Sequence, residues 1–215
     1  MMQDYFARAR REVLPFIPQN IEKMLDVGCG EGVTTALIRQ NNPSITWAGG
    51  IELFADAAAQ AEHTMDQVWC GNLDDLSFEQ DIEPGTLDVV LCLDILEHLQ
   101  DPWEAVRRLT PLLKPEGRLI ISIPNIRNWK FIKNLLFKGD FEYKNAGLLD
   151  RTHLRFFTRA TAIKLAETGG LHVTYHGNIH PWKAFDMRNI LSRLTLGGLD
   201  DLMIKQFVIV ASPKA

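Results

Sequence analysis

Residues 24–32 read Met-Leu-Asp-Val-Gly-Cys-Gly-Glu-Gly, and this stretch decides the fold of the chain. Its apolar start predicts a buried parallel strand, and the residues after Gly32 follow a helical pattern. Glycine permits a positive φ and lets a ligand lie against bare backbone. The first turn of the helix offers free N–H groups to an electron-rich ligand. The stretch therefore predicts a strand, a tight turn and a helix, with a nucleotide-like cofactor at the turn.

The spacing of the glycines indicates which cofactor binds. A dinucleotide turn needs Gly-x-Gly-x-x-Gly, but this chain has Val33 where the third glycine would fall. Asp26 stands at the turn, where a carboxylate repels a pyrophosphate but can hold a cationic amino-acid head. Glu52 follows Gly30 by 22 residues and ends the second predicted strand. We expect it to bind both ribose hydroxyls, although an ordinary helix-capping acid is the alternative.

Composition limits the class of protein. The chain has 215 residues, of which 46% are hydrophobic and 23% charged, as in an ordinary soluble globular protein. A net charge of −4 disfavours nucleic acid as a partner. There is no signal-like or membrane-spanning run, so we expect a cytoplasmic protein. Cys29, Cys70 and Cys92 have no metal-like spacing, which predicts buried thiols and no metal site.

Hydrophobic periodicity predicts alternating strands and helices in one α/β domain over residues 1–215. The predicted strands are 23–27, 45–51, 67–70, 87–93, 119–123, 171–175 and 206–211. The predicted helices are 4–16 (within an N-terminal segment 1–20), 33–40, 54–63, one capped by Asp101 and ended by 115–117, 158–168, and 182–196. The last of these helices is either a second cover for the sheet or the surface of a homodimer.

Two further phrases join the glycine turn in resembling a known family. They are Leu93-Asp-Ile-Leu-Glu-His-Leu99 and Leu113-Lys-Pro-Glu-Gly117. Together with 24–32 they resemble the motifs of class I S-adenosylmethionine-dependent methyltransferases. The resemblance implies a Rossmann-like, seven-stranded, mostly parallel sheet in the order 3-2-1-4-5-7-6, with the last strand antiparallel and helices on both faces. It also implies S-adenosylmethionine as cofactor and S-adenosylhomocysteine as product.

The resemblance assigns cofactor-binding roles along the carboxyl ends of the first four strands. Asn72 stands where the family often has an aspartate that binds the adenine amino group. Its amide oxygen can still accept from that group, the Leu73 N–H can reach a ring nitrogen, and Asp74 or Asp75 is the alternative. The expected cofactor residues are Asp26, Gly28, Cys29, Gly30, Glu52, Leu53, Asn72, Leu73 and Leu93.

Residues 125–158 form an insertion after the fifth strand that we expect to act as a lid. From 125 to 159 the chain has eight basic and three acidic residues. Residues 126–138 read as a basic amphipathic helix, which predicts either a lid packed on the domain, a surface for an anionic or lipid-linked small-molecule acceptor, or a peripheral membrane contact. The apolar stripe of this helix comprises Ile126, Trp129, Ile132, Leu135 and Leu136.

A general base for methyl transfer is expected to be a histidine. The candidates are His98, just after the fourth strand, and His153 within the insertion. His153 is preferred because Asp150, Arg151 and Arg155 lie close to it in sequence. A structural hydrogen bond at a loop corner is the alternative for each.

The acceptor is the least determined feature. The series from Ser122 to Thr158 resembles a bacterial group associated with glycan and polysaccharide assembly, which implies an oxygen or nitrogen of a sugar, glycolipid or other envelope precursor. The alternatives are a membrane-associated quinol O-methyltransferase, to which the core is also similar, and a cofactor-binding pseudoenzyme that regulates a partner. A nucleic-acid methyltransferase is disfavoured because no Asn-Pro-Pro-aromatic step follows the fourth strand.

Overall fold

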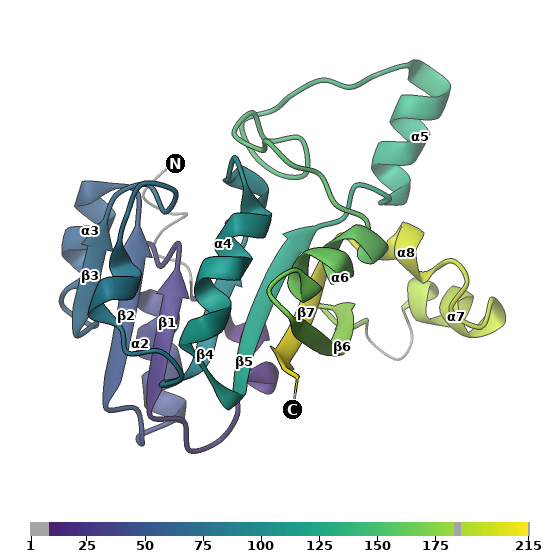
Figure 1. The fold of residues 1–215 in the computed structure, drawn as a ribbon. Coiled ribbons are helices and arrows are strands. Elements are labelled where there is room, and N and C mark those ends of the chain that lie inside the picture. Colours follow the sequence, from purple (N-terminus) through teal and green to yellow (C-terminus); the bar gives the residue numbers. More distant parts are fainter. Residues whose placement is uncertain (1–8, 183–185, 215) are drawn as a thin grey trace.

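The computed structural model describes residues 9–182 and 186–214. Its seven-stranded sheet has the order β3-β2-β1-β4-β5-β7-β6, as predicted (Figure 1). Among the described strands, β7 alone runs in the direction opposite to the other six. The strands are β1 (Lys23–Val27), β2 (Trp47–Glu52), β3 (Gln67–Cys70), β4 (Leu87–Leu93), β5 (Leu113–Pro124), β6 (Leu171–Asn178) and β7 (Gln206–Pro213).

Helices cover both faces of the sheet, and the alternation of side chains along the strands explains why. In β4, Val90 and Cys92 point to the face covered by α4 (Pro102–Leu109) and α6 (Arg159–Glu167). Val89 and Leu91 point to the other face, with α2 (Val33–Asn41) and the 3-10 helix η1 (Arg11–Phe16). Helix α3 (Ala55–Ala61) packs Ala61 in a small cluster with Cys29 of the glycine turn.

The predicted boundary between the fourth helix and the fifth strand is wrong. The helix ends at Leu109 and passes through a 3-10 turn, η4 (Thr110–Leu112), into β5, which already begins at Leu113. Pro115 and Gly117 therefore lie inside the strand. Leu113 pairs with Leu87, and the pairing of β4 with β5 then shifts and resumes at Val89 and Arg118. This irregularity accommodates the extra residues of β5.

The N-terminal helix also differs from the prediction. Residues 4–8 lie outside the described part, and the described remainder is the 3-10 helix η1, with Pro15 inside it. The Ile17 N–H donates to the Leu14 carbonyl at 3.2 Å, the short-range pattern of a 3-10 turn. Pro15 therefore lies inside the element, which ends at Phe16.

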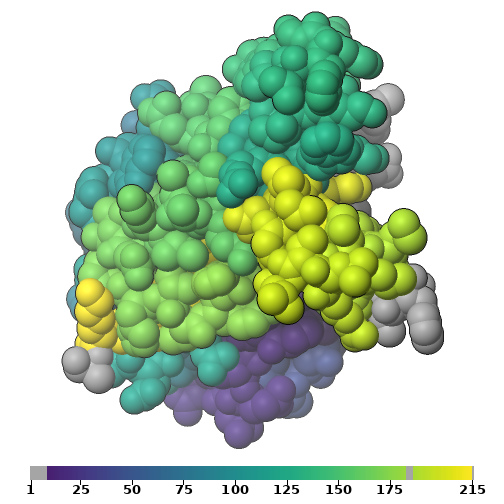
Figure 2. Space-filling view, turned by 90° about the vertical axis from the view of Figure 1, so that its right-hand side faces the viewer, coloured from purple at the N-terminus to yellow at the C-terminus, as the bar shows by residue number. Residues whose placement is uncertain are grey.

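The insertion carries α5 (Trp129–Lys138), which stands away from the sheet in Figure 1. Its two ends lie together, since Asn125 and Phe157 form a bridge and the Ile126 N–H donates to the Phe157 carbonyl at 2.9 Å. The side-chain amides of Asn125 and Asn128 donate to the Ile204 carbonyl at 2.9 and 3.1 Å. The base of the insertion is thereby anchored to the C-terminal segment, which lies directly below α5 in Figure 2.

Three of the five residues in the apolar stripe predicted for this helix are exposed, and the other two, Ile126 and Ile132, are half-buried. Trp129, Leu135 and Leu136 are exposed, and Phe131, outside the predicted stripe, is the buried residue of α5. Phe131 meets Phe141 edge to face, with ring centroids 5.4 Å apart. This ring contact ties α5 to the later part of the insertion.

The predicted helix 182–196 is shorter in the structure. It becomes α7 (Met187–Leu194), followed by a short α8 (Asp200–Met203) that the sequence did not predict; residues 183–185 lie outside the described part. No residue of α7 is buried, which argues against the role of a second cover. The dimer surface stays a prediction.

Two remaining expectations concern cysteines and membranes. Cys29 and Cys92 are buried, but Cys70 is exposed because it ends the edge strand β3. The prediction of a buried thiol is wrong at that position. Among the described residues, no helix is both long and apolar enough to cross a bilayer.

Candidate active site

The glycine turn is held rigidly against the end of β2. Gly28, Gly30 and Gly32 have φ of 74°, 56° and 77°, values that L side chains rarely adopt. The N–H groups of Gly28 and Cys29 donate to the Ile51 carbonyl at 2.8 and 3.1 Å. A Cβ on Gly32 would lie 2.4 Å from the hydroxyl oxygen of Thr64. The turn therefore requires glycine for its backbone conformation and, at Gly32, for space as well.

Glu52 joins β2 to this turn. Its side chain is 4% exposed; Oε2 accepts from the Gly30 N–H at 2.8 Å and Oε1 from the Phe54 N–H at 3.0 Å. An ionised carboxylate has about four acceptor sites, so each oxygen can accept a further hydrogen bond. The two carboxylate oxygens can thus accept from the two ribose hydroxyls that the sequence assigned to Glu52.

Asp26 is buried beneath the turn, with 2% of its surface exposed. The Thr35 hydroxyl donates to its Oδ2 at 2.9 Å, which ties the end of β1 to the first turn of α2. Burial raises the pKa of Asp26 to about 7, and the nearby charge of Glu52 adds to the shift, while Thr35 opposes it. A cationic group would favour the ionised form, so the ammonium role stays a prediction that pH can test.

The predicted adenine contacts lie at the end of β3. The side-chain oxygen of Asn72 accepts from the Asp74 N–H at 3.2 Å and so already shapes a turn. Leu73 is buried and Leu53 is exposed, while Leu93 is half-buried at the end of β4. The strand registers bring the carboxyl ends of β1 to β4 to one edge of the sheet, and the predicted cofactor residues follow those ends.

Comparison with known proteins identifies the family and the fold. Residues 2–176 match the model of a family described as methyltransferase domain. The chain belongs to this family. It is an S-adenosylmethionine-dependent methyltransferase, and its cofactor is S-adenosylmethionine.

Relatives and solved structures agree with this identification. A ubiquinone biosynthesis O-methyltransferase from Burkholderia multivorans is 31% identical over 168 residues, covering 72% of this chain and 69% of the relative. Another from Aeromonas salmonicida is 27% identical, covering 74% and 66%. About a third of each relative thus lies outside the match. A SAM-dependent methyltransferase from Archaeoglobus fulgidus shares the fold with a TM-score of 0.66 at 17% identity, covering 98% of this chain and 97% of that one.

In this methyltransferase the two predicted histidines come together. The rings of His98 and His153 meet edge to face with centroids 4.7 Å apart. Nδ1 of His153 lies 3.0 Å from the Leu148 carbonyl, and Nδ1 of His98 lies 3.2 Å from the Thr152 carbonyl. A carbonyl oxygen only accepts, so each Nδ1 carries the proton and each Nε2 keeps a free lone pair. Burial, and then the neighbouring His153, lower the pKa of His98.

The three charged residues that lie close to His153 in sequence have different surroundings in the structure. Asp150 accepts from the N–H and hydroxyl of Thr152 at 2.9 and 2.6 Å, and these bonds hold its pKa below the usual value although burial opposes them. The side chain of Arg155 instead donates to the Gln100 carbonyl at 2.5 Å. Arg151 is exposed.

Glu97 is a residue that the sequence analysis missed. It is 1% exposed, and neither carboxylate oxygen has a hydrogen-bond partner among the described residues. Burial, with the charge of Asp94, raises its pKa well above the usual value. Its peptide carbonyl accepts from the Leu154 and Arg155 N–H groups at 2.8 and 3.0 Å, which ties it to the insertion. The sequence did contain a signal for Glu97, because it is an acid between the apolar residues Leu96 and Leu99. It lies in the segment quoted above for its resemblance to the family.

Asp94 centres a second group that was missed. It has a φ of 56°, uncommon for a residue other than glycine. Its carboxylate forms an ion pair with Arg10 and accepts from the Ser122 hydroxyl at 3.0 Å and from the Gln206 amide. This network joins η1 to the edge where β4 and β5 end and β7 begins. Its members are far apart in sequence, so no local pattern reveals it.

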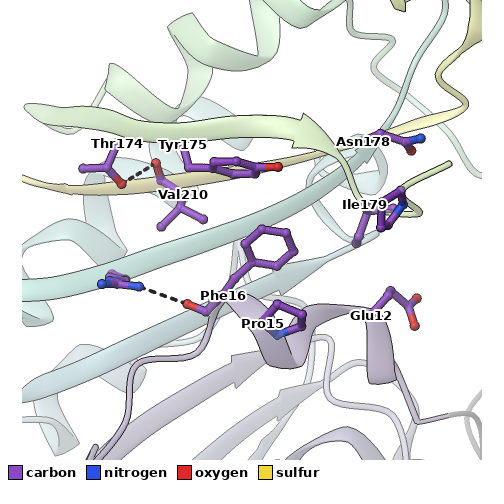
Figure 3. A pocket seen from close by; sticks show the side chains of 10 residues that line it. Glu12, Pro15, Phe16, Thr174, Tyr175, Asn178, Ile179 and Val210 are labelled. Atoms are coloured by element: carbon purple, nitrogen blue, oxygen red, sulfur yellow. Dashed lines mark hydrogen bonds between the residues drawn. The ribbon is translucent and has the colours of Figure 1, made fainter. Parts of the chain in front are cut away.

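A pocket of about 550 Å³ lies elsewhere, between η1 and β6 (Figure 3). Phe16 and Tyr175 meet there with ring centroids 5.2 Å apart. None of the residues that line it belongs to the predicted cofactor or catalytic sets. We therefore do not assign the methyl-transfer site to this pocket.

Proposed function

We propose that this methyltransferase acts on a hydroxyl oxygen of a hydrophobic, lipid-linked acceptor at a membrane surface. The exposed apolar and basic surface of α5 carries this proposal. The matched relatives, named ubiquinone biosynthesis O-methyltransferases, support an oxygen acceptor attached to a lipid. The proposal favours the quinol-type alternative over the sugar or glycolipid acceptor.

The surface of α5 has the composition of an interfacial helix. Leu136 and Phe137 are 70% and 71% exposed, and Trp129 is 48% exposed. Lys130 and Lys133 are exposed on the same helix. Apolar residues beside lysines suit the boundary between lipid headgroups and acyl chains, and each basic residue adds about 1 kcal/mol near an anionic leaflet.

The chain's own residues have two tasks in the reaction. When bound, S-adenosylmethionine supplies an electrophilic methyl group on a sulfonium. The glycine turn and Glu52 hold and orient the cofactor, so that the acceptor oxygen can approach in line. The acceptor hydroxyl loses its proton as its oxygen gains the methyl group. We assign that proton to Nε2 of His153, or to Nε2 of His98, because Nδ1 of each ring is bonded to a carbonyl.

Vesicle flotation and an acceptor assay test the proposal together. The protein should float with vesicles of phosphatidylglycerol and phosphatidylcholine. Leu136→Asp combined with Phe137→Asp should reduce flotation by about 10-fold or more, since burying a carboxylate in the interface is costly. The same variant should keep its cofactor affinity and its activity on a detergent-solubilised polyprenyl catechol, but lose activity on that catechol in vesicles.

A matched variant and an acceptor panel make the test decisive. Met187→Asp with Leu194→Asp changes two side chains on α7 that are 80% and 77% exposed, and it should float like the wild type. Loss of flotation in the α7 variant alone would contradict the assignment to α5. Methylation of sugar nucleotides or glycolipids, with none of the catechol, would favour the glycan acceptor. Cofactor binding without turnover on any acceptor would favour a pseudoenzyme.

A further inference from the structure

The pocket between η1 and β6 combines an apolar wall with one half-buried cation. Its volume of about 550 Å³ lies in the range of small-molecule sites, and apolar or aromatic side chains form most of its wall (Figure 3). The cation is Arg118 of β5. We propose that this pocket binds a planar aromatic carboxylate, which strengthens cofactor binding through η1. The proposal does not depend on which acceptor is methylated.

Arg118 supplies the charge that selects an anion. It lies two residues before Ile120 in β5, so both side chains point to the face of the sheet that η1 covers. Its Nη1 donates to the Phe16 carbonyl at 3.3 Å. No carboxylate of the described residues forms an ion pair with Arg118. A guanidinium has five donors in a planar fork that matches a carboxylate, so most of its donors are available to a ligand.

Two aromatic rings select the body of the ligand. Phe16 of η1 and Tyr175 of β6 have ring centroids 5.2 Å apart and planes tilted by 37°. Tyr175 is 47% exposed, so part of its ring is free for a further contact. Aromatic rings pack favourably on one another in offset or edge-to-face arrangements. The remaining apolar wall consists of Pro15, Ile179, Pro181 and Val210. An aromatic acid can therefore pack its ring on Phe16 and Tyr175 and pair its carboxylate with Arg118.

The wall that η1 contributes continues to the edge of the sheet that holds the cofactor. Glu12 lines the pocket, and its carboxylate is already paired with Arg10, whose Nε donates to it at 2.5 Å. Arg10 also forms an ion pair with Asp94 at the end of β4. The Arg10 backbone N–H donates at 3.2 Å to the hydroxyl of Thr34, in the first turn of α2. The same short segment thus contacts the pocket, the end of β4 and the helix that follows the glycine turn.

This connection gives the ligand an effect on the cofactor. Because Pro15 and Phe16 form one wall of the pocket, the complete site exists only while η1 lies against the sheet. A ligand that binds this arrangement shifts the population towards it. In the same arrangement Arg10 is held against Asp94 and α2. The aromatic acid and S-adenosylmethionine should therefore bind with positive cooperativity, and the effect of each on the other must be equal.

Titration calorimetry of the full chain with cinnamate tests the pocket. Cinnamate is a planar aromatic monocarboxylate, and cinnamamide is its neutral analogue. We expect one cinnamate per chain and several-fold weaker binding of cinnamamide, because hydrogen bonds to a charged group are stronger.

Variants on two walls assign the binding to this pocket. Arg118→Gln should weaken cinnamate binding by about 10-fold or more, since the charged partner is lost. Glutamine can still donate to the Phe16 carbonyl. Tyr175→Leu, at an exposed position, should weaken binding by about 2- to 10-fold through loss of the ring contact. Lys164→Gln removes a positive charge from an exposed position on α6, across the sheet, and should bind like the wild type.

The effect on the cofactor is measured on the same samples. Saturating cinnamate should tighten S-adenosylmethionine binding by about 5-fold or more, and the cofactor should tighten cinnamate binding by the same factor. Glu12→Gln should still bind cinnamate but reduce this factor, because Arg10 loses its ion pair with Glu12.

The outcomes separate the pocket from the cofactor site. Absence of cinnamate binding, or equal binding by Arg118→Gln and the wild type, would overturn the pocket assignment. An S-adenosylmethionine affinity that does not respond to saturating cinnamate would overturn the connection through η1. Titration with S-adenosylmethionine alone tests the cofactor site itself, so a failure there is distinguished from a failure of the pocket.

Discussion

The cofactor edge and the insertion are built on opposite principles. At the cofactor edge, Asp26 and Glu52 are buried and hydrogen-bonded, and the glycine turn is bonded to the end of β2. In the insertion, α5 exposes most of its apolar side chains and is held mainly at its base. The difference fits the roles proposed for the two regions: a preorganised cofactor site at the first, and at the second exposed apolar side chains for contact with a membrane surface.

Two glycines give the sharpest contrast between these regions. Gly32 and Gly139 have similar φ values of 77° and 63°. A Cβ on Gly32 would meet Thr64 at 2.4 Å, whereas a Cβ on Gly139 meets nothing within 4 Å. Gly32→Ala should therefore lose about 2–4 kcal/mol of unfolding free energy, from strain and overpacking together, and Gly139→Ala about 1 kcal/mol from strain alone. Urea denaturation measures both, and equal losses would remove the contrast.

Glu52 tests whether the cofactor edge is preorganised for a ribose. Glu52→Ala should weaken binding of S-adenosylmethionine by about 1.5–3 kcal/mol, because hydrogen bonds to a charged group are lost. Titration calorimetry gives the affinity, and Lys133→Ala on α5 serves as the control with unchanged affinity. Since Glu52 also accepts from the Gly30 and Phe54 N–H groups, the variant's unfolding free energy is measured in parallel. Unchanged cofactor affinity would show that the ribose is bound elsewhere.

Asp26 predicts a smaller, pH-dependent effect. Burial raises its pKa to about 7, so the carboxyl is mostly protonated at pH 6 and mostly ionised at pH 8. If the carboxylate holds the cofactor ammonium, affinity should rise by about 10-fold over this interval. The unfolding free energy should change in the opposite sense. Burial in the folded chain favours the protonated carboxyl of Asp26. The contribution of this group to the unfolding free energy is therefore full at low pH and is lost as the pH rises through about 7.

A conservative variant separates Asp26 from other titrating groups. Asp26→Asn should flatten both pH profiles while keeping the shape of the side chain and a partner for Thr35. Calorimetry at several pH values gives the affinity, and thermal denaturation gives the stability. A wild-type affinity that does not vary between pH 6 and 8 would remove the ammonium role.

The sequence predicted the core well because its signals are local. β1, β3 and β4 begin and end where the apolar runs predicted, and Asp101 and Thr158 cap α4 and α6 as expected. The start of β5 was missed because proline and glycine ordinarily end an element, whereas here they lie in an extended strand that pairs irregularly with β4.

The rest of the site depends on contacts between distant residues. The helical period of α5 predicted an apolar stripe, but a period does not show whether any surface covers it. Likewise, the free carboxylate of Glu97 becomes informative only when His153, from the insertion, lies next to it. The two catalytic candidates were proposed because His98 follows the fourth strand and His153 has charged neighbours in the sequence. Their position next to each other and to Glu97 required the structure.

The bridge between Asn125 and Phe157 has a consequence for how such enzymes diversify. Because the insertion leaves and re-enters the core at one point, residues 126–156 form a cassette whose exchange leaves the strand order intact. A chimera that carries a short turn between Asn125 and Phe157 should still bind S-adenosylmethionine, while losing acceptor recognition. Substrate range can thus change by replacement of one segment, without altering the half of the molecule that holds the methyl donor.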